Sequence, residues 1–570
     1  MAFLSSRKSR GHKYWSIVES RRVNGKPRNF ILEYLGTAEK LLQKLNNKES
    51  MIIKSYSHGD TSALINIAKE LNIISIINKH TFNNSKKPKS RNISVGASLL
   101  LASIGRACRP TSKMGWYDWC KNTSLEYCLK SSFKNLTSQH FWNQMNLVKL
   151  ESIPLIERDI VKELIKKYDI KLDCLLFDTT NFFTFIDSTN KHCDLPQRGK
   201  NKQKRGDLRQ LGMALLASRK NQFPLFHKTY KGNNNDITVF QEVFSEFVDR
   251  IKSIYSKLLD VTFIFDKGNN SKKNFKKLDN ENDLYYVGGL VPSYFKDLIK
   301  AANNNFQMIT VDGENIPAFR TKQKVWEEER TCIVTISEQL KEGQIRGINQ
   351  GLNKRYKKLE NLKKQLENPK TRTKLSKEDL EERLDKIIKG QFIKGILQYK
   401  IIELKNDKYS FTYNLNQELF DKLKSEILGR QILVTNRHEW SNKEIILAYR
   451  GQAKVEYAFR NLKNPFHMAV RPQYHWTDQK IEVHILICII GYLLSVAAYT
   501  KVKKNCNYKK NINAFMNDLK TIRLVVCTIE GKEKIKYQLE EMTSEIKKIV
   551  KLLEVTNEDI RPNINISGYI

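Results

Sequence analysis

The chain has 570 residues, which corresponds to about three or four domains of ordinary size. Hydrophobic residues make up 40%, which suffices for packed cores but argues against a membrane protein. The 99 Lys and Arg residues exceed the 61 Asp and Glu residues, giving a formal net charge of +38. Because this excess is spread along the chain, it favours a nucleic-acid partner over drift in composition.

Neither a secretory signal nor a membrane span is expected. Residues 1–10 have no apolar stretch behind them, and the apolar run at 485–498 is shorter than the roughly 20 residues of a span. We predict a cytoplasmic protein in which 485–498 is a buried core helix. The nine cysteines lack C-x-x-C pairs, which predicts reduced thiols and neither a disulfide framework nor a zinc site.

Residues 13–36 predict a β-hairpin. Two strand-like segments flank Asn24-Gly25, a dipeptide typical of two-residue turns because both positions favour positive φ. Basic side chains crowd the tip, and of these we expect Arg22 and Lys26 to contact DNA. A solvated hairpin end is the alternative interpretation.

Residues 60–150 predict helices. Apolar residues recur at helical spacing from Ala63 to Leu71, and residues 95–104 form a second apolar helix. Trp116 and Trp119 are expected in the core and not on a base-stacking surface. This region is interpreted as a helical DNA-binding domain.

From residue 171 the pattern changes to a mixed α/β sheet. Strands are predicted at 172–177, 210–218, 223–230 and 261–265, with a helix at 237–259. The first of these strands ends at Asp178 and the last ends at Asp266. An acid at the end of a strand faces the crevice where a sheet presents its ligand groups.

Residues 301–428 interrupt this pattern. They combine a strand-like part at 306–336 with charged helices at 354–367 and 377–389, without a large core of their own. After the interruption a strand is predicted at 431–435. A helix follows at 441–463, where Ser441 and Glu444 are spaced as a capping box. An apolar helix and a mostly helical tail complete the chain.

Glu456 lies on this last predicted helix. At about 100° per residue, Tyr449, Gln452, Arg460 and Lys463 fall within about 40° of it, and an apolar stripe lies beside them. One interpretation is a solvent-exposed ion pair between Glu456 and Arg460, contributing about 0.3–0.5 kcal/mol. The other is a functional face that carries one acid and two bases.

The three acids together suit phosphodiester chemistry. Two divalent ions about 3.5–4 Å apart can activate an attacking oxygen and stabilise a leaving oxygen. Magnesium prefers carboxylate ligands. We therefore predict that Asp178, Asp266 and Glu456 are catalytic and bind two Mg²⁺ ions, for which Mn²⁺ can substitute. Arg460 and Lys463 are expected to hold the phosphates that flank the cut.

These motifs resemble those of the DDE transposases of bacterial insertion sequences, in the broad branch that includes the Tn-five transposase. Tyr449, Glu456 and Lys463 fit the signature Tyr-x2-Arg-x3-Glu-x6-Lys, but Gln452 stands where the signature has arginine. The resemblance covers most of the chain and is weakest in 337–428 and after 505. The other segments that carry it are Asp178-Thr179-Thr180, residues 232–236, Asp266-Lys267-Gly268 with Ser271 and Asn274, and residues 471–475.

The resemblance implies an RNase H-like catalytic core interrupted by an insertion domain. The predicted regions are a basic β-hairpin region at 1–50, a helical DNA-binding domain at 51–165, the first part of the core at 166–300, the insertion domain at 301–428, the second part of the core at 429–505, and a helical C-terminal region at 506–570.

The resemblance also implies cut-and-paste transposition by a bacterial protein that is nucleoid-associated when bound to DNA. The protein would bind terminal inverted repeats as a homodimer, cut the DNA with water, and join the freed 3′-hydroxyl to double-stranded target DNA. Tyr449 and Arg471 are expected to contact DNA, and Trp326 to hold a flipped base.

Three other readings stay open at this point. An RNase H-like endonuclease without strand transfer would use the same three acids. A domesticated DNA-binding protein derived from a transposase would not need them, although Gln452 would suit it. A basic scaffold would leave the two strand-end aspartates unexplained.

Overall fold

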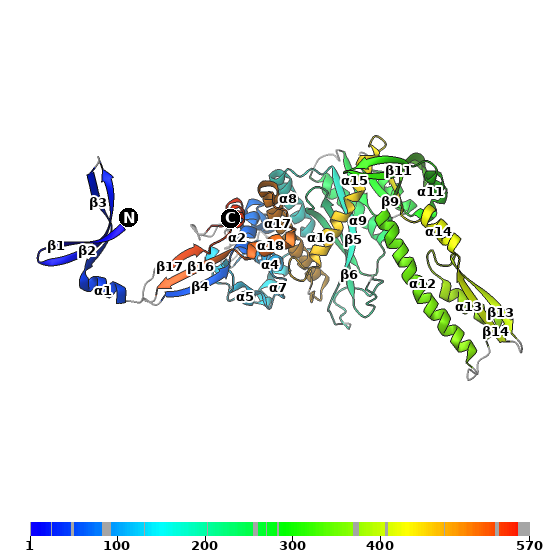
Figure 1. The fold of residues 1–570 in the computed structure, drawn as a ribbon, viewed down its shortest axis with the longest axis horizontal. Helices are drawn as coiled ribbons and strands as arrows, with labels where there is room; N and C mark the ends of the chain where they lie inside the picture. The colour runs from blue at the N-terminus through cyan, green and yellow to red at the C-terminus, as the bar shows by residue number, and fades with distance from the viewer. Residues whose placement is uncertain are drawn as a thin grey trace.

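The computed structural model is drawn out along one axis, with a small N-terminal sheet at one end and a projecting helical arm at the other (Figure 1). The structure describes residues 2–23, 26–46, 51–81, 93–129, 131–187, 189–201, 203–254, 260–269, 271–281, 284–368, 375–404, 408–471, 473–529 and 535–556.

The N-terminal sheet contains β1 (Ala2–Ser9), β2 (His12–Val23) and β3 (Lys26–Thr37), followed by α1 (Ala38–Asn46). The predicted hairpin is confirmed, because β2 and β3 pair antiparallel and Val23 lies opposite Lys26. The Asn24-Gly25 turn itself lies outside the described residues. The sequence reading missed β1, which turns into β2 through Arg10 and Gly11, both at positive φ. Gly11 suits this two-residue turn.

The helices predicted in residues 60–150 are confirmed, and they form a helical body. Its helices are α2 (Gly59–Glu70), α3 (Ile73–Thr81), α4 (Val95–Cys108), α5 (Trp116–Cys120), α6 (Leu125–Cys128), α7 (Ser138–Asn146) and α8 (Ser152–Tyr168). Trp116 and Trp119 are buried, as predicted.

The core of this body is formed around α17 (Asp478–Cys506), which packs on α4 and α2. By length and composition α17 could cross a membrane, but 94% of its apolar window is buried inside the protein. A helix that is apolar all round is typical of a protein core, so the predicted core helix is confirmed.

The two ends of the chain meet in a second small sheet. Strand β16 (Arg523–Ile529) lies between β17 (Ile535–Leu539) and β4 (Met51–Ser57). The C-terminal region also contains α18 (Ile512–Lys520) and α19 (Ser544–Leu552). The prediction of a mostly helical tail missed the two strands β16 and β17. The strand β16 pairs with a segment far away in sequence, which local periodicity cannot reveal.

The central sheet has nine strands in the order β10-β11-β12-β15-β9-β8-β5-β6-β7. Pairing is parallel between β5, β8 and β9 and antiparallel elsewhere, so the predicted mixed α/β sheet is confirmed. The strand bounds are β5 (Cys174–Phe183), β6 (Gln210–Ser218), β7 (Pro224–Lys231), β8 (Val261–Phe265), β9 (Leu284–Leu290), β10 (Gln307–Val311), β11 (Glu314–Val325), β12 (Glu328–Ile336) and β15 (Arg430–Thr435).

Helix α9 (Asp236–Lys252) packs on the middle of this sheet. The ring of Phe240 lies 5.2 Å from that of Phe177 on β5, and Phe244 lies 5.3 Å from Phe263 on β8. Side chains alternate along a strand, so Asp178 points to the face opposite α9. Between β8 and β9 lie the short helix Lys267–Asn269 and α10 (Lys272–Asp279), and after β9 the short helix Pro292–Tyr294 and α11 (Lys296–Asn303).

The segment predicted as a single insertion, 301–428, has two parts. Strands β10 to β12 extend the central sheet and pair with β15. The remainder builds the arm from α12 (Glu338–Glu367), α13 (Lys377–Ile388), β13 (Leu397–Leu404), β14 (Lys408–Leu415) and α14 (Gln417–Glu426).

The arm has a hydrophobic core of its own, which contains Leu352, Leu359, Leu384 and Phe411. The segment was expected to lack a large core of its own, and this cluster is small beside the main core of the protein. The apolar residues are spaced far apart among charged ones, so they become a core only when α12, α13 and the β13-β14 hairpin pack together.

Candidate active site

Asp178 lies in the middle of β5, and the prediction that it ends the strand is wrong. The strand continues to Phe183 because residues 179–183 pair with β6. On its other edge, β5 pairs with β8 only from Cys174 to Leu176. The sheet therefore opens on the β8 side just before Asp178. In the parallel pairing of β5 with β8, Cys174 lies opposite Thr262. If the same register continued for four more residues, Asp178 would lie opposite Asp266.

Asp266 directly follows β8, as predicted. Its Oδ1 accepts hydrogen bonds from the backbone N of Lys267 (2.7 Å) and from the hydroxyl of Tyr449 (3.1 Å). Asp178 Oδ1 accepts a bond from the backbone N of Thr179 (2.8 Å). These bonds hold each carboxylate in a defined orientation.

The helix that carries Glu456 is two helices. Helix α15 (Asn442–Arg450) ends and α16 (Gln452–Leu462) begins at Gly451, so the prediction of one continuous helix is wrong. Glu456 is exposed on α16, which packs on β5. In the described part of the chain it forms no ion pair with Arg460, which argues against the ion-pair interpretation.

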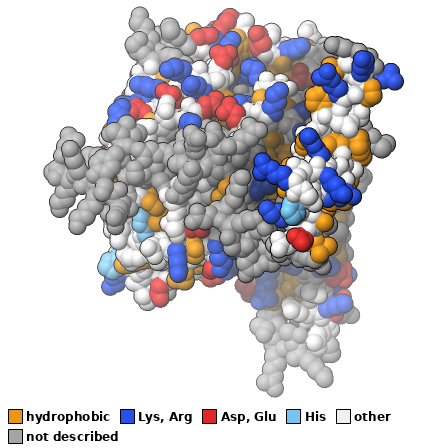
Figure 2. All heavy atoms as spheres, turned by 90° about the vertical axis from the view of Figure 1, so that its left-hand side faces the viewer, with side chains coloured by type: hydrophobic (Ala, Val, Ile, Leu, Met, Phe, Trp, Pro, Cys, Tyr) orange, Lys and Arg blue, Asp and Glu red, His pale blue; other side chains and the backbone are white. Residues whose placement is uncertain are grey.

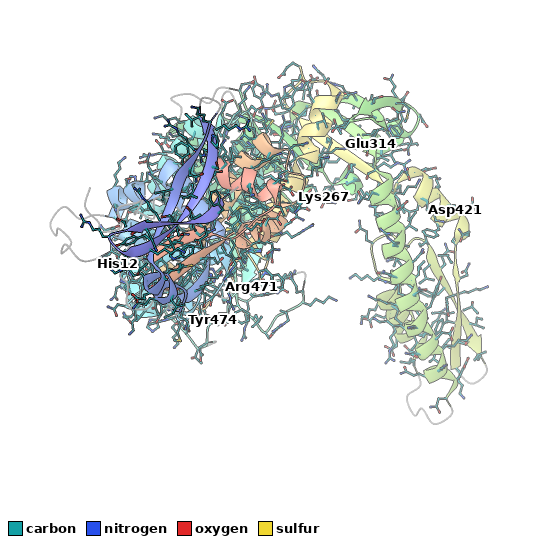
Figure 3. The ribbon with its side chains drawn as sticks, turned by 60° about the vertical axis from the view of Figure 1, so that its left-hand side comes forward. His12, Lys267, Glu314, Asp421, Arg471 and Tyr474 are labelled. Carbon is teal, nitrogen blue, oxygen red and sulfur yellow. The ribbon has the colours of Figure 1, made fainter. Side chains whose placement is uncertain are left out.

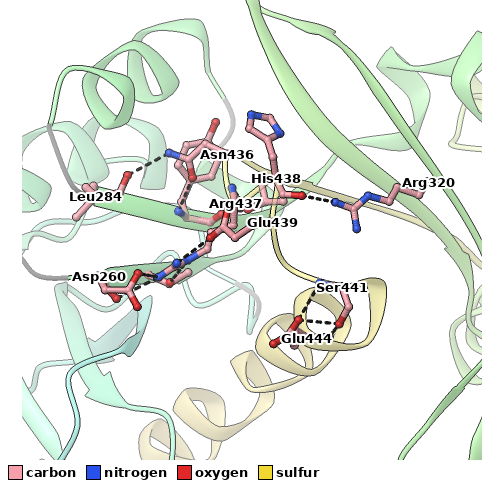
Figure 4. A network of polar contacts seen from close by, with 12 residues as sticks. Asp260, Leu284, Arg320, Asn436, Arg437, His438, Glu439, Ser441 and Glu444 are labelled. Atoms are coloured by element: carbon pink, nitrogen blue, oxygen red, sulfur yellow. Dashed lines mark hydrogen bonds and ion pairs between the residues drawn. The ribbon is translucent and has the colours of Figure 1, made fainter.

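A polar network fixes the segment that leads into α15 (Figure 4). The guanidinium of Arg437 is buried, forms an ion pair with Asp260 and donates to Thr262 Oγ1 (3.1 Å). Ser441 and Glu444 form the predicted capping box at the start of α15. The strand-to-helix connection is thus tied to β8, the strand that leads to Asp266.

All three acids line one pocket with a volume of about 830 Å³. The ammonium group of Lys463 donates to the hydroxyl of Thr180 and lies 5.3 Å from the ring centroid of Phe182. Besides the acids, the lining residues are Thr179, Thr180, Asn181, Asn201, Gln203, Tyr230, Gln452, Phe459, Arg460, Lys463, Asn464 and Asn513.

Asp266 also lines a second cavity of about 870 Å³, whose wall includes its hydrogen-bond partner Tyr449. Burial, followed by the negative charge of Asp266, raises the pKa of Tyr449. Gly289 on β9 leaves room for the ring, since a Cβ there would lie 2.5 Å from the Tyr449 hydroxyl. Lys267, Lys296 and Lys300 also line the second cavity.

Gln452 stands where the family signature has arginine. Its side chain is buried, whereas an arginine that binds phosphate has to be accessible to DNA. Nε2 of Gln452 donates to the backbone oxygen of Phe177 (2.8 Å), the residue before Asp178. The side chain therefore joins the start of α16 to β5 at the point where β5 has separated from β8.

The residues fit a hard divalent cation in the chemistry of their donor groups. Three carboxylates line the same pocket, and carboxylate oxygens are the ligands that Mg²⁺ prefers. Among the described residues, no three His, Cys, Asp or Glu side chains lie close enough together to hold one ion. The fit therefore rests on the chemistry of the donor groups and on the pocket that they share.

Four predicted DNA-binding residues lie away from this pocket. Trp326 occupies the turn between β11 and β12 at φ +50° and packs on Phe275, with ring centroids 4.7 Å apart. Arg22 and Lys26 are exposed near the tip of the N-terminal hairpin. Arg471 is half-buried on the helical body, apart from Lys267 (Figure 3).

Some site residues were missed by the sequence reading. Thr180, Tyr230 and Asn201 line the pocket but were assigned no role. Thr180 could have been found, because it belongs to the quoted motif after Asp178. Tyr230 and Asn201 come from a strand end and a loop that only the fold brings to the acids.

Basic side chains are numerous over the protein surface. Figure 2 shows Lys and Arg side chains scattered among acidic ones over the described part of the face at the N-terminal end.

Two known families match parts of the chain. The family described as transposase DDE domain matches residues 183–494, more than half of the chain. This match includes Asp266 and Glu456 and begins five residues after Asp178. The N-terminal domain of the IS1634 family transposases matches residues 4–60.

One solved structure is similar over much of its length, a piggyBac transposase synaptic complex with hairpin DNA. It is 11% identical, covers 88% of this chain and 86% of its own, and gives a TM-score of 0.36. Comparison with curated proteins gives no match.

Proposed function

Because this chain belongs to the transposase DDE domain family and is a DNA transposase of an insertion sequence, we propose that it cuts DNA at the ends of its element and joins those ends to target DNA. The observation that carries the proposal is that Asp178, Asp266 and Glu456 line one pocket. They come from β5, from the end of β8 and from α16, within what we interpret as an RNase H-like core.

Asp178, Asp266 and Glu456 would hold two divalent ions, Mg²⁺ or Mn²⁺. When bound, the ions supply activation of the attacking oxygen and stabilisation of the leaving oxygen. Tyr449 positions the carboxylate of Asp266 through its hydroxyl. Gln452 holds α16, and with it Glu456, against β5.

Arg460 and Lys463 supply the positive charge of the pocket. Arg460 is exposed, and the Lys463 ammonium lies at the hydroxyl of Thr180, two residues after Asp178. Cations beside a carboxylate site suit the phosphates that flank the scissile bond. We assign these two side chains to the DNA backbone on either side of the cut.

Contacts outside the pocket would select the DNA. The exposed Arg22 and Lys26 project from a separate small sheet, which suits a contact with double-stranded DNA remote from the cut. Arg471 is assigned to the same DNA, and Trp326 to a base displaced near the arm. The ligand we infer is the terminal inverted repeat. Two repeats must be held together, so the active assembly is proposed to be a homodimer, acting in the bacterial cytoplasm.

The reaction has two chemically similar steps. In the first, a water oxygen bonds to phosphorus and the P–O3′ bond breaks, leaving a 3′-hydroxyl on the element. In the second, that hydroxyl attacks a target phosphate and displaces the 3′ oxygen of the target strand. One pocket serves both steps, because each is an in-line displacement at phosphorus.

The test is cleavage of linear DNA that carries the repeats flanking the gene, with Mg²⁺ and with EDTA. We expect Mg²⁺-dependent cuts at the repeat ends, and joining of pre-cut ends to a plasmid. Cleavage without joining would identify an endonuclease that lacks strand transfer. Specific binding with neither reaction would identify a DNA-binding protein derived from a transposase.

A further inference from the structure

The second cavity, which shares Asp266 with the pocket of the three acids, combines basic side chains with a largely apolar wall. Lys267, Lys296 and Lys300 line it and are exposed, and none of them forms an ion pair within the described part of the chain. The apolar part of the wall includes Leu290, Pro292, Ile299, Phe392, Ile427 and Leu433.

The other charged groups of this cavity leave the three lysines as its available cations. Arg430 is buried, and its guanidinium donates to Asn303 Oδ1 (2.9 Å) and to the backbone oxygen of Leu428 (2.9 Å). Glu426 also lines the cavity and carries the charge opposite to that of Arg430. Lysine ammonium groups bind phosphate as point charges, so the surplus of exposed lysines favours a phosphate-bearing ligand.

The volume and the apolar wall narrow the choice of ligand. A volume of about 870 Å³ lies within the range of cavities that enclose one small organic molecule. It therefore has room for roughly one or two nucleotides of a single strand, but not for a duplex. An aromatic and apolar wall, to which Phe392 contributes, suits the face of an unstacked base.

The cavity lies on the arm side of the acids. Its wall contains α11 and the start of the arm helix α12, whereas the pocket of the acids extends to Asn464 and to Asn513 on α18. The N-terminal sheet and the arm lie at opposite ends of the molecule (Figure 1). An element end held by the N-terminal sheet would thus reach the acids from the body side, and the DNA beyond the cut would continue toward the arm.

We propose that the second cavity binds the nucleotide whose 5′ phosphate is attacked, which is the first flanking nucleotide in the cut and a target nucleotide in the joining step. This inference rests on the proposed function. In the cut, the water oxygen bonds to phosphorus and the P–O3′ bond to the element breaks, so the flank keeps the phosphate. In joining, the element 3′ oxygen bonds to the target phosphorus and the bond to the target 3′ oxygen breaks. Protons are exchanged with solvent.

The same arrangement serves both steps. The element 3′ oxygen stays on the body side, first as the leaving group and then as the nucleophile. The nucleotide that carries the attacked phosphate stays on the arm side, beside Lys296 and Lys300. Removal of these two charges should therefore weaken the cut and the joining alike, without affecting the grip on the element itself.

The experiment compares wild type with Lys296→Gln/Lys300→Gln on two forms of one element end, pre-cut or extended by two unpaired nucleotides beyond the cut. Without Mg²⁺, wild type should bind the extended end more tightly, with a slope of log K against log salt steeper by about 0.7 per added phosphate contact. The variant should lose this difference but bind the pre-cut end within about twofold of wild type. With Mg²⁺, cleavage of the extended end and joining at limiting target should each fall about tenfold.

A matched control is Lys354→Gln/Lys358→Gln on α12. These two lysines are exposed and four residues apart, as Lys296 and Lys300 are, but they line neither cavity. The control should behave as wild type, and equal losses in both double variants would refute the inference. Weaker binding of the pre-cut end by Lys296→Gln/Lys300→Gln, or unchanged cleavage or joining, would also overturn it. If wild type shows neither reaction, the proposed function fails and the inference with it.

Discussion

The hydroxyl of Tyr449 donates to Oδ1 of Asp266 across the junction between two cavities. A hydrogen bond to a charged group contributes about 1.5–3 kcal/mol, and exposure of Asp266 reduces this to about 1 kcal/mol. We expect Tyr449→Phe to cut DNA about five- to tenfold more slowly at saturating Mg²⁺. A rate equal to wild type across a Mg²⁺ titration would show that the hydroxyl does not position Asp266.

Gly289→Ala tests the same relationship from the opposite side. The new Cβ would lie 2.5 Å from the Tyr449 hydroxyl, so the ring must move away from Asp266. We expect a loss of cleavage at least as large as in Tyr449→Phe. Gly343→Ala on α12 is the control, because a Cβ there meets no described atom within 4 Å. Similar cleavage rates for the two alanine variants would contradict the prediction.

Removal of any one catalytic carboxylate should separate binding from chemistry. For Asp178→Asn, Asp266→Asn and Glu456→Gln we expect cleavage to fall about 1,000-fold or more, with end binding largely intact. Gel shifts and cleavage of the same labelled DNA measure the two properties. Normal cleavage by any one of these variants would remove that residue from the site.

Lys463→Ala should weaken binding to DNA ends and make it less sensitive to salt. Loss of one phosphate contact lowers the slope of log K against log salt by about 0.9. Lys454 is the matched control, since it lies on α16, which Lys463 directly follows, and its ammonium donates to the backbone oxygen of Arg219 outside the pocket lining. Equal slopes for wild type and Lys463→Ala would argue against a phosphate contact.

Lys113 should make stability depend on pH. Burial, together with the charges of Arg106 and Lys480, lowers the pKa of Lys113 to about 7. Its side chain bonds to His475 and His484. Between about pH 7 and 10 the unfolded chain binds a proton at this position that the folded chain does not, so stability should rise with pH. The measurement is the melting temperature as a function of pH. We expect it to rise between about pH 7 and 10 in wild type but not in Lys113→Met. Parallel curves of melting temperature against pH for the two proteins would refute the prediction.

The sequence was sufficient to identify the acids but not to define their surroundings. Asp266 ends an apolar strand and was predicted correctly. Asp178 was misplaced because the polar residues after it continue β5, and their pairing with β6 is a tertiary contact. The break at Gly451 was missed because both helices continue a single apolar period.

Long-range strand pairing explains the other differences. Strands β10 to β12 lie within the segment expected to leave the core, yet they extend the central sheet beside β15. Nothing in their local pattern specifies that neighbour. The role of Gln452 was likewise hidden, since its partner Phe177 is distant in the chain.

The pairing of β4 with β16 has a consequence for how the protein is made. Strand β4 joins the N-terminal sheet to the helical body, but its partner is synthesised near the end of the chain. The body is therefore incomplete until β16 has been synthesised, while the basic N-terminal hairpin emerges early. A chain that terminates before β16 would present that hairpin without a finished body, and under the proposed DNA contacts of Arg22 and Lys26 it would occupy DNA without cutting it.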